Sequence, residues 1–233
     1  MSAVRVDPAT ATMISLIGSL ADNKSALGRR YGEWAVSAPT IESAVAAAAM
    51  AQDELGHARS TYPVLSKLGV ERSDSGLDAG DPMRAIASEL PDWASFIAAN
   101  LVVDGVLTTF VAGTRDSSIE PLAQRARKIL QEEGAHRVHA EAWTRRIARA
   151  GGEDLVLLER RIHEMWAQAA RWPGPDSDPG YREAIGQGMV AAGPLAIRDR
   201  VRDWLTALME GLGASVSLPE PEDWSEWDPQ HRR

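Results

Sequence analysis

The fold that this sequence predicts is all-α, a bundle of long helices that run up and down beside one another. Residues that favour helices fill long stretches of the chain, and clusters of Gly, Pro and Asp separate these stretches. No segment keeps the alternation of apolar and polar residues that marks a half-buried strand, and no Asn-Gly pair marks a hairpin. Helices are therefore the only regular elements that we expect.

The boundaries of the expected helices follow from start and stop signals along the chain. Ala38-Pro39 ends the first helix, Thr40 caps the second, and Gly151-Gly152 ends the fourth. The expected helices cover residues 8–36, 40–69, 93–113, 119–150, 153–171 and 181–212. A polar loop, residues 71–82, and a break rich in Pro and Gly, residues 172–180, lie between them. We thus expect four long core helices and two C-terminal helices.

We expect the chain to divide into one ferritin-like helical domain, residues 1–215, and a C-terminal tail, residues 216–233. The tail is rich in Pro and acidic residues, so we expect it to be irregular. It still carries Trp224 and Trp227, and this pair predicts that the tail docks on this chain or on a partner rather than staying free.

Composition narrows the class of function. The net charge is −8 and the pI is near 5.2, which argues against nucleic acid as a partner because a phosphate backbone needs a basic face. Cysteine is absent, which excludes disulfides, thiolate metal sites and a cysteine nucleophile within this chain. The start lacks the design of a signal peptide, and no uncharged apolar run is long enough to span a membrane. We expect a cytoplasmic protein without a membrane partner.

Two Glu-x-x-His motifs give the strongest functional signal. Glu54 and His57 lie in the second expected helix, and Glu133 and His136 lie in the fourth. Residues three apart share one face of a helix, so each pair can reach a single point. Two such helices, with one carboxylate from each of two others, form the dimetal site of ferritin-like bundles. We therefore expect a ferritin-like bundle that binds one or two ions per chain, iron or manganese; two surface pairs on amphipathic helices are the alternative.

The rest of the bundle offers fewer candidates. Asp104 lies within an apolar run of the third expected helix, where an ionised carboxylate is costly unless it is paired or bound to a metal. Asp53 is the candidate acceptor for the second ring nitrogen of a ligand histidine, whereas Glu132 is expected to point into solvent. The first expected helix brings no Glu to the middle of the bundle, and its nearest acids are Asp22 and Glu33.

Beyond these motifs, the chain resembles the phenylacetic acid catabolic family, the subunits of phenylacetyl-CoA epoxidase, over residues 15–215. The resemblance is carried by LADNKSALGRRYGEWAVSAPTIESAVAAAAMAQDELGHARSTY, NLVVDGV and ILQEEGAHRVHAEAW, and its densest motif is AQDELGHAR, residues 51–59. It implies a ferritin-like fold and a family that pairs a catalytic di-iron subunit with a sister structural subunit that has lost the metal ligands. A separate flavin and iron–sulfur reductase delivers electrons. The implied reaction inserts one oxygen atom from O2 into an aromatic acyl-CoA thioester.

The resemblance also assigns roles to single residues. Glu54, Asp104 and Glu133 match catalytic carboxylates and metal ligands, and His57 and His136 match the remaining metal ligands. The first expected helix departs from this pattern, because DNKSALGRRYGEW is more similar to the structural subunit. It places Lys24 near the position where the catalytic subunit has a glutamate.

A lysine at that position leaves three outcomes open. Two divalent ions beside three carboxylates are already short of negative charge, and the ammonium of Lys24 would add to the excess. Lys24 could point away from a dimetal site with five protein ligands. It could instead weaken one metal position and leave a mononuclear site. It could also replace a metal ion and pair with the carboxylates directly.

The retained histidines favour metal binding, so our leading hypothesis is a non-haem di-iron monooxygenase component. Its substrates would be O2 and an acyl-CoA or related small organic molecule, and it would work in a homo- or hetero-oligomer with a sister subunit. The second hypothesis is a non-catalytic structural subunit, which predicts a salt bridge from Lys24 to Glu54 or Glu133. A metal-dependent oxidase of the ferritin type is the third.

Overall fold

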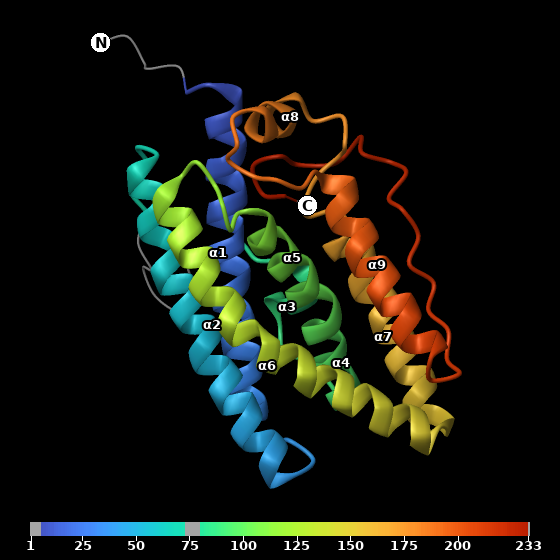
Figure 1. Cartoon of the computed structure of the whole chain (residues 1–233). Helices are drawn as coiled ribbons and strands as arrows, with labels where there is room; N and C mark the ends of the chain where they lie inside the picture. Colours follow the sequence, from blue (N-terminus) through green and yellow to red (C-terminus); the bar gives the residue numbers. More distant parts are fainter. Residues whose placement is uncertain (1–5, 73–79, 233) are drawn as a thin grey trace.

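The computed structural model describes residues 6–72 and 80–232, and within these residues it contains helices and no strand. The bundle consists of α1 (Pro8–Trp34), α2 (Ile41–Lys67), the continuous segment α4 (Trp93–Ala98), η1 (Ala99–Asp104) and α5 (Gly105–Gly113), and α6 (Glu120–Ala150). Beside it lie α7 (Gly152–Ala169) and α9 (Pro194–Glu210), and the connections contain the short helices α3 (Arg84–Ala87) and α8 (Pro179–Gly186) (Figure 1). The expected all-α, ferritin-like bundle is confirmed.

Successive helices of the bundle alternate in direction except at one connection. α1 and α2 are antiparallel, but α2 and the α4–η1–α5 segment run in the same direction (Figure 1). Between the end of α2 and the start of α4 the chain returns along the bundle and forms α3 on the way. Of the expected loop 71–82, residues 73–79 lie outside the described residues. A single long crossover of this kind is characteristic of ferritin-like bundles.

Side-chain caps fix where α1, α2 and α4 begin. Asp7 accepts a hydrogen bond from the backbone N–H of Thr10 at 3.0 Å, and Thr40 accepts one from Ser43 at 3.2 Å. Asp92 does the same for α4 with the N–H of residue 95 at 2.7 Å. Each cap satisfies a backbone donor that the first turn of the helix leaves free.

α1 is buried on all sides over its middle part. Every residue from Leu16 to Gly28 is buried, so the polar residues of this stretch lie inside the protein. Gly28 allows a close approach of α1 and α2, because a Cβ at this position would lie 2.7 Å from the side chain of Leu55 and 3.1 Å from the carbonyl oxygen of Ala51. Buried polar groups need partners, and this requirement shapes the site.

Two expected helices are not continuous α-helices. Residues 181–212 are expected to form one helix, but α8 ends at Gly186 and α9 starts at Pro194, because Gly188 adopts a φ of 68° and the pair Gly193-Pro194 starts a new helix. The other is the segment Trp93–Gly113, whose central turn is the π-helix η1. By length and composition this segment could cross a membrane, yet 72% of its apolar window is buried within the bundle.

Candidate metal centre

Lys24 lies at the centre of the bundle and is completely buried. Its ammonium donates hydrogen bonds to Glu54 Oε1 at 3.0 Å, to Asp104 Oδ1 at 2.6 Å and to a carboxylate oxygen of Glu133. The three acceptors come from α2, the end of η1 and α6, so one cation holds three other segments of the bundle. An ammonium has three N–H donors, and here each of them meets a carboxylate.

His57 and His136 complete this group, which we call the Lys24 cluster. His136 Nδ1 lies 3.4 Å from carboxylate oxygens of Glu54, Asp104 and Glu133. His57 Nδ1 lies 3.4 Å from Glu133 Oε1 and 3.6 Å from Glu54 Oε2. The five residues that the sequence singles out as metal ligands are therefore brought together, and Lys24 lies among them.

The outer ring nitrogens of the histidines are held by acids from the opposite helix. His57 on α2 donates from Nε2 to Glu132 on α6 at 2.7 Å. His136 on α6 faces Asp53 on α2 at 3.3 Å. The acid that precedes each Glu-x-x-His motif thus orients the histidine of the other motif. The side chains of Glu132 and Asp53 are 34% and 37% exposed, so they connect the cluster to the surface.

Burial and mutual attraction set the charges of the cluster. Burial opposes a charged Lys24, but the carboxylates around it raise its pKa well above the ordinary value. Burial would raise the pKa of Glu54, but Lys24 lowers it to about 2, and the same balance holds the pKa of Glu133 well below its usual range. Burial and the repulsion of its two neighbouring carboxylates raise the pKa of Asp104 to about 6.

Both histidines are held in the charged form. Burial opposes this, but the carboxylates of Glu133 and Glu54 beside its ring raise the pKa of His57 to about 9. Burial also opposes the charge on His136, whose pKa the hydrogen bonds to Asp104, Glu133 and Glu54 nevertheless raise. At neutral pH three cationic groups therefore face three carboxylates. The cluster balances its own charge, which is the condition for burying so many ionised groups together.

The comparison with known proteins agrees with the motifs. The sequence matches the family described as phenylacetic acid catabolic protein over residues 2–233. The chain belongs to this family. One relative, a component of the 1,2-phenylacetyl-CoA epoxidase of Escherichia coli (strain K12), is 23% identical over 210 residues, which cover 87% of this chain and 82% of the relative. The resemblance that the sequence motifs indicate is confirmed.

Asp22 and Glu33, two acids of α1, do not contribute to the Lys24 cluster. Asp22 accepts hydrogen bonds from Arg72, at 2.6 and 2.8 Å, and from the hydroxyl of Tyr62 at 2.8 Å. Glu33 pairs with Arg30 at 2.8 Å near the end of α1, and its side chain is 39% exposed. The sequence offers Asp22 and Glu33 as possible contributors from the first helix, but in the structure both carboxylates are engaged by other partners. A helix turns by about 100° per residue, which sends Asp22 and Lys24 to different faces.

Four residues of the cluster could hold a metal ion. Glu54, Asp104, Glu133 and His136 each offer one ligand atom, and these atoms lie within 4.8 Å of one another. Glu54 Oε2 and His57 Nδ1 are buried without a hydrogen bond of their own, which leaves part of the donor set unused. However, Lys24 uses one oxygen from each carboxylate. A metal pair does not fit while the ammonium occupies this position.

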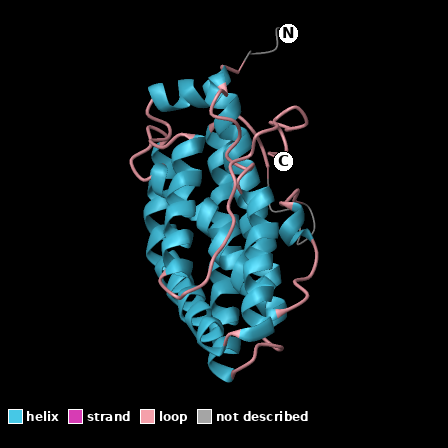
Figure 2. Ribbon diagram, turned by 90° about the vertical axis from the view of Figure 1, so that its right-hand side faces the viewer, coloured by secondary structure: helices cyan, strands magenta, loops and turns pink. Residues whose placement is uncertain are grey.

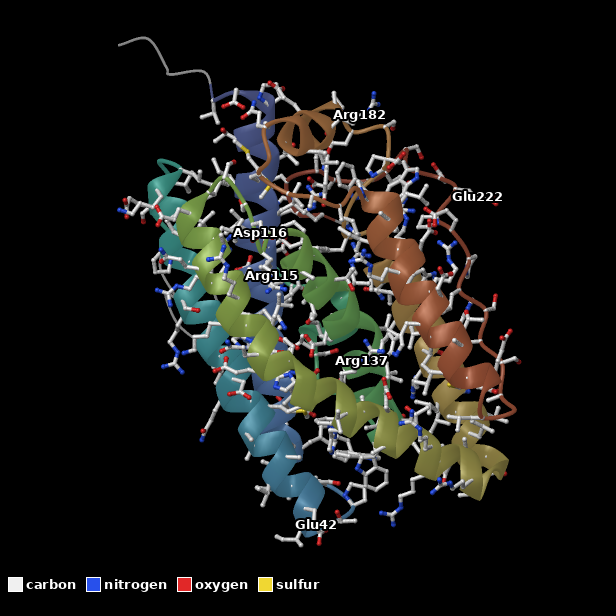
Figure 3. The ribbon with its side chains drawn as sticks, in the orientation of Figure 1. Glu42, Arg115, Asp116, Arg137, Arg182 and Glu222 are labelled. Carbon is white, nitrogen blue, oxygen red and sulfur yellow. The ribbon has the colours of Figure 1, made fainter. Side chains whose placement is uncertain are left out.

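Two cavities reach the cluster from opposite sides. One of about 160 Å³ opens between α2 and α6 and is lined by His57, Glu132, Arg125 and Lys128. The other, of about 220 Å³, lies between α5, α6 and α9 and touches Asp104 and Glu133. Arg137, which extends from α6 towards α9 in Figure 3, lines the second cavity and lies over the ring of Trp204 at 4.3 Å. Both cavities are small beside an acyl-CoA molecule.

Glu132 is the residue whose place the sequence pattern predicts wrongly, because its side chain is only 34% exposed and contacts His57. The expectation that it points into solvent rests on its position before Glu133, from which it leaves the helix in another direction. That direction leads into the groove between α6 and α2, where His57 lies. The signal that could have found it is the paired pattern itself, since an acid precedes the Glu of both motifs.

Proposed function

We propose that this chain is a non-catalytic structural subunit of a multicomponent oxygenase of the phenylacetyl-CoA epoxidase type. The single observation that carries the proposal is the position of Lys24, whose ammonium donates to Glu54, Asp104 and Glu133 at the centre of the bundle. In this proposal the lysine supplies the positive charge that metal ions supply in an active sister subunit. Its role is to hold the four bundle segments together.

The charge balance supports this role over a dimetal centre. Two divalent ions bring four positive charges, whereas Glu54, Asp104 and Glu133 bring three negative ones. Loss of the protons from both histidines and from Lys24 would still leave an excess positive charge in a buried site. With Lys24 charged and no metal pair, the same groups are balanced. The residue that would correct the excess, a carboxylate at position 24, is the one that this chain lacks.

The family relation supports the assembly. The relative from Escherichia coli is one component of an epoxidase, so we propose that this chain acts together with a sister subunit. The sister subunit would hold the iron, a separate reductase would supply electrons, and the complex would insert an oxygen atom from O2 into an aromatic acyl-CoA thioester. This chain would contribute to the assembly and not to the chemical step.

A second candidate is an oxygenase component with one metal ion per chain. It is supported by the convergence of Glu54, Asp104, Glu133 and His136 within 4.8 Å and by the unused donor atoms beside them. One divalent ion, held by neutral imidazoles and three carboxylates, balances charge even with Lys24 protonated. The ion would be iron or manganese by the chemistry of its oxygen and nitrogen donors. Metal binding of this kind requires the ammonium of Lys24 to break at least one of its hydrogen bonds to Glu54, Asp104 and Glu133.

Metal analysis of a matched variant pair tests the proposal. The wild-type chain, Lys24→Glu and Lys24→Gln are each reconstituted without oxygen with Fe(II) or Mn(II), desalted and analysed for bound metal. We expect well under one ion per chain for the wild type and retained metal for Lys24→Glu, which supplies the missing carboxylate. Lys24→Gln removes the ammonium without adding an anionic ligand and serves as the control.

Activity of the assembled complex gives the second arm. The chain is combined with its sister subunit and the reductase, and turnover is compared for wild type and His136→Ala in this chain alone. We expect turnover to persist as long as the complex forms. Stoichiometric metal in the wild-type chain, together with loss of both metal and turnover in His136→Ala, would overturn the structural role in favour of the second candidate.

A further inference from the structure

The C-terminal tail lies on the body of the protein in an extended path. After α9 the chain reverses at Gly213, which has a φ of 72°, and residues 214–232 contain no helix that the structure describes. The tail runs back along α9 and α7 and then crosses to the start of α1 (Figures 1 and 2). Near its end Ser15 of α1 donates to the carbonyl oxygen of Pro229 at 2.6 Å.

Side chains of α7, and one residue just beyond it, bind the backbone of the tail. The indole N–H of Trp166 donates to the carbonyl oxygen of Pro219 at 2.8 Å, and a ring nitrogen of His163 lies 2.7 Å from the carbonyl oxygen of residue 217. Arg171 donates to the carbonyl oxygen of Asp223 at 2.6 Å. Three side chains thus contact backbone carbonyls at separate points along an extended, proline-containing segment.

Two side chains in the middle of the tail meet cations, and Leu218 and Arg232 of the tail are buried, 7% and 1% exposed. Glu220 forms ion pairs with Arg198 and with Arg202, the latter at 2.5 Å. The ring of Trp224 has guanidinium groups over it, those of Arg171 at 5.1 Å and Arg198 at 5.5 Å. An acid and a tryptophan four residues apart thus meet a matching set of cations on α9 and at the end of α7.

We propose that these residues form a recognition site for an extended, acidic, tryptophan-containing segment, and that the tail of a second copy of this chain can occupy it. We call the site the tail-binding surface; it consists of His163, Trp166, Arg171, Arg198 and Arg202. Its contacts are to residues 217–224 and not to the turn at 211–216. A tail from another copy can therefore make the same contacts once that turn opens, as in domain swapping.

The chain's own tail has the advantage at low concentration. A short connection to the site gives an effective concentration of about a millimolar, so a second copy competes poorly at micromolar concentrations. Changes that weaken the chain's own tail leave the surface intact and remove this advantage. The site should then accept a tail supplied from outside, and this consequence separates an exchangeable recognition site from a fixed part of the fold.

The test uses the full chain and a labelled synthetic peptide of residues 214–233. Binding is followed by fluorescence anisotropy for the wild type and for the tail-weakened chain Glu220→Gln/Trp224→Ala. We expect the tail-weakened chain to bind the peptide about tenfold more tightly, or better, because its own tail no longer competes. Adding Arg171→Ala and Arg202→Gln should abolish binding, and a peptide with the same two tail changes serves as the matched control.

A complementation experiment tests the second copy itself. The tail-weakened chain is mixed with the surface-weakened chain Arg171→Ala/Arg202→Gln, and mass is measured by light scattering after size exclusion. We expect a heterodimer that neither chain forms with itself. Equal or absent peptide binding in wild-type and tail-weakened chains, or no heterodimer on mixing, would overturn the proposal. Thermal unfolding checks that each variant is folded; if the double change unfolds the chain, Glu220→Gln alone takes its place in both assays.

Discussion

The Lys24 cluster and the tail-binding surface both join cations to acids. Trp166 and Arg198 of the tail-binding surface are also buried, but its outermost ion pair is more exposed than the Lys24 cluster. Lys24, Glu54, Asp104 and Glu133 are almost completely hidden, whereas the ion pair of Arg202 with Glu220 leaves 28% and 35% of the two side chains exposed. In the interior no water solvates a charge that has lost its partner, so the stability of each charged group depends on the others. At the surface, water replaces a lost partner. We therefore expect the same chemistry to give a fixed centre in one place and an exchangeable contact in the other.

Removing the central cation should have the largest effect. Lys24→Met leaves three buried carboxylates without their shared partner, and we expect it to lower the free energy of unfolding by about 3–5 kcal/mol. Urea unfolding in the presence of a chelator measures this loss. Arg202→Met at the tail-binding surface is the matched control and should cost under about 1 kcal/mol. Similar losses in the two variants would contradict the distinction between the regions.

A smaller loss is expected for one of the two histidines. His136→Gln removes the contacts of Nδ1 with three carboxylates, and hydrogen bonds to charged groups contribute about 1.5–3 kcal/mol. His139 lies one turn further along α6, half-buried against the rings of Trp93 and Phe96, with no hydrogen bond to either ring nitrogen. His139→Gln should therefore cost less than His136→Gln in the same unfolding assay. A larger loss for His139→Gln would show that packing contributes more than charge to the stability of this part of α6.

The cluster should also give the protein a distinct pH dependence. The folded pKa of His57 is raised to about 9 from an ordinary value of 6.5. Its contribution to stability is fully present below the unfolded pKa and is lost as the pH rises through about 9. We expect the free energy of unfolding to fall over this window in the wild type and to fall less in His57→Gln. If the free energy of unfolding falls equally with pH in the two proteins, His57 does not contribute to the charge balance of the cluster.

The smallest effect on stability is expected at the tail. Trp224→Ala removes the ring that Arg171 and Arg198 cover, and exposed cation–π contacts contribute about 0.5–1 kcal/mol. We expect a loss of this size in thermal unfolding, together with faster proteolysis of residues after 213. A loss comparable with that of Lys24→Met would mean that the contacts of Trp224 contribute as much to stability as the buried charges of the Lys24 cluster.

Much of the site could be predicted because it depends on spacing within single helices. Three-residue spacing places Glu54 with His57 and Glu133 with His136 whatever the details of the bundle. Asp104 could be found because an ionised group inside an apolar run must have a partner. The tail's two tryptophans likewise predict docking, and the structure places Trp224 against this chain.

The remaining features depend on relations between helices, which spacing alone does not fix. Asp22, Asn23 and Lys24 are consecutive and all buried, yet Asp22 meets Arg72, Asn23 meets the N–H of Met83, and Lys24 meets the carboxylates. Which of the three faces the cluster is set by the rotation of α1 against α2. The contact of His57 with Glu132 depends in the same way on the distance between α2 and α6. The break at 187–193 is marked in the sequence by Gly188 and the pair Gly193-Pro194, but the helix-forming residues on both sides outweigh these signals in the prediction.

The central claim is that the ammonium of Lys24 occupies the position that a metal pair would otherwise take. The most direct measurement is an anomalous-scattering map from crystals of the wild-type chain grown with Mn(II) or Fe(II). The account predicts Lys24 Nζ within hydrogen-bond distance of Glu54, Asp104 and Glu133, and no anomalous peak among them. One or two peaks between the Glu-x-x-His motifs, with Lys24 turned away from the carboxylates, would contradict it.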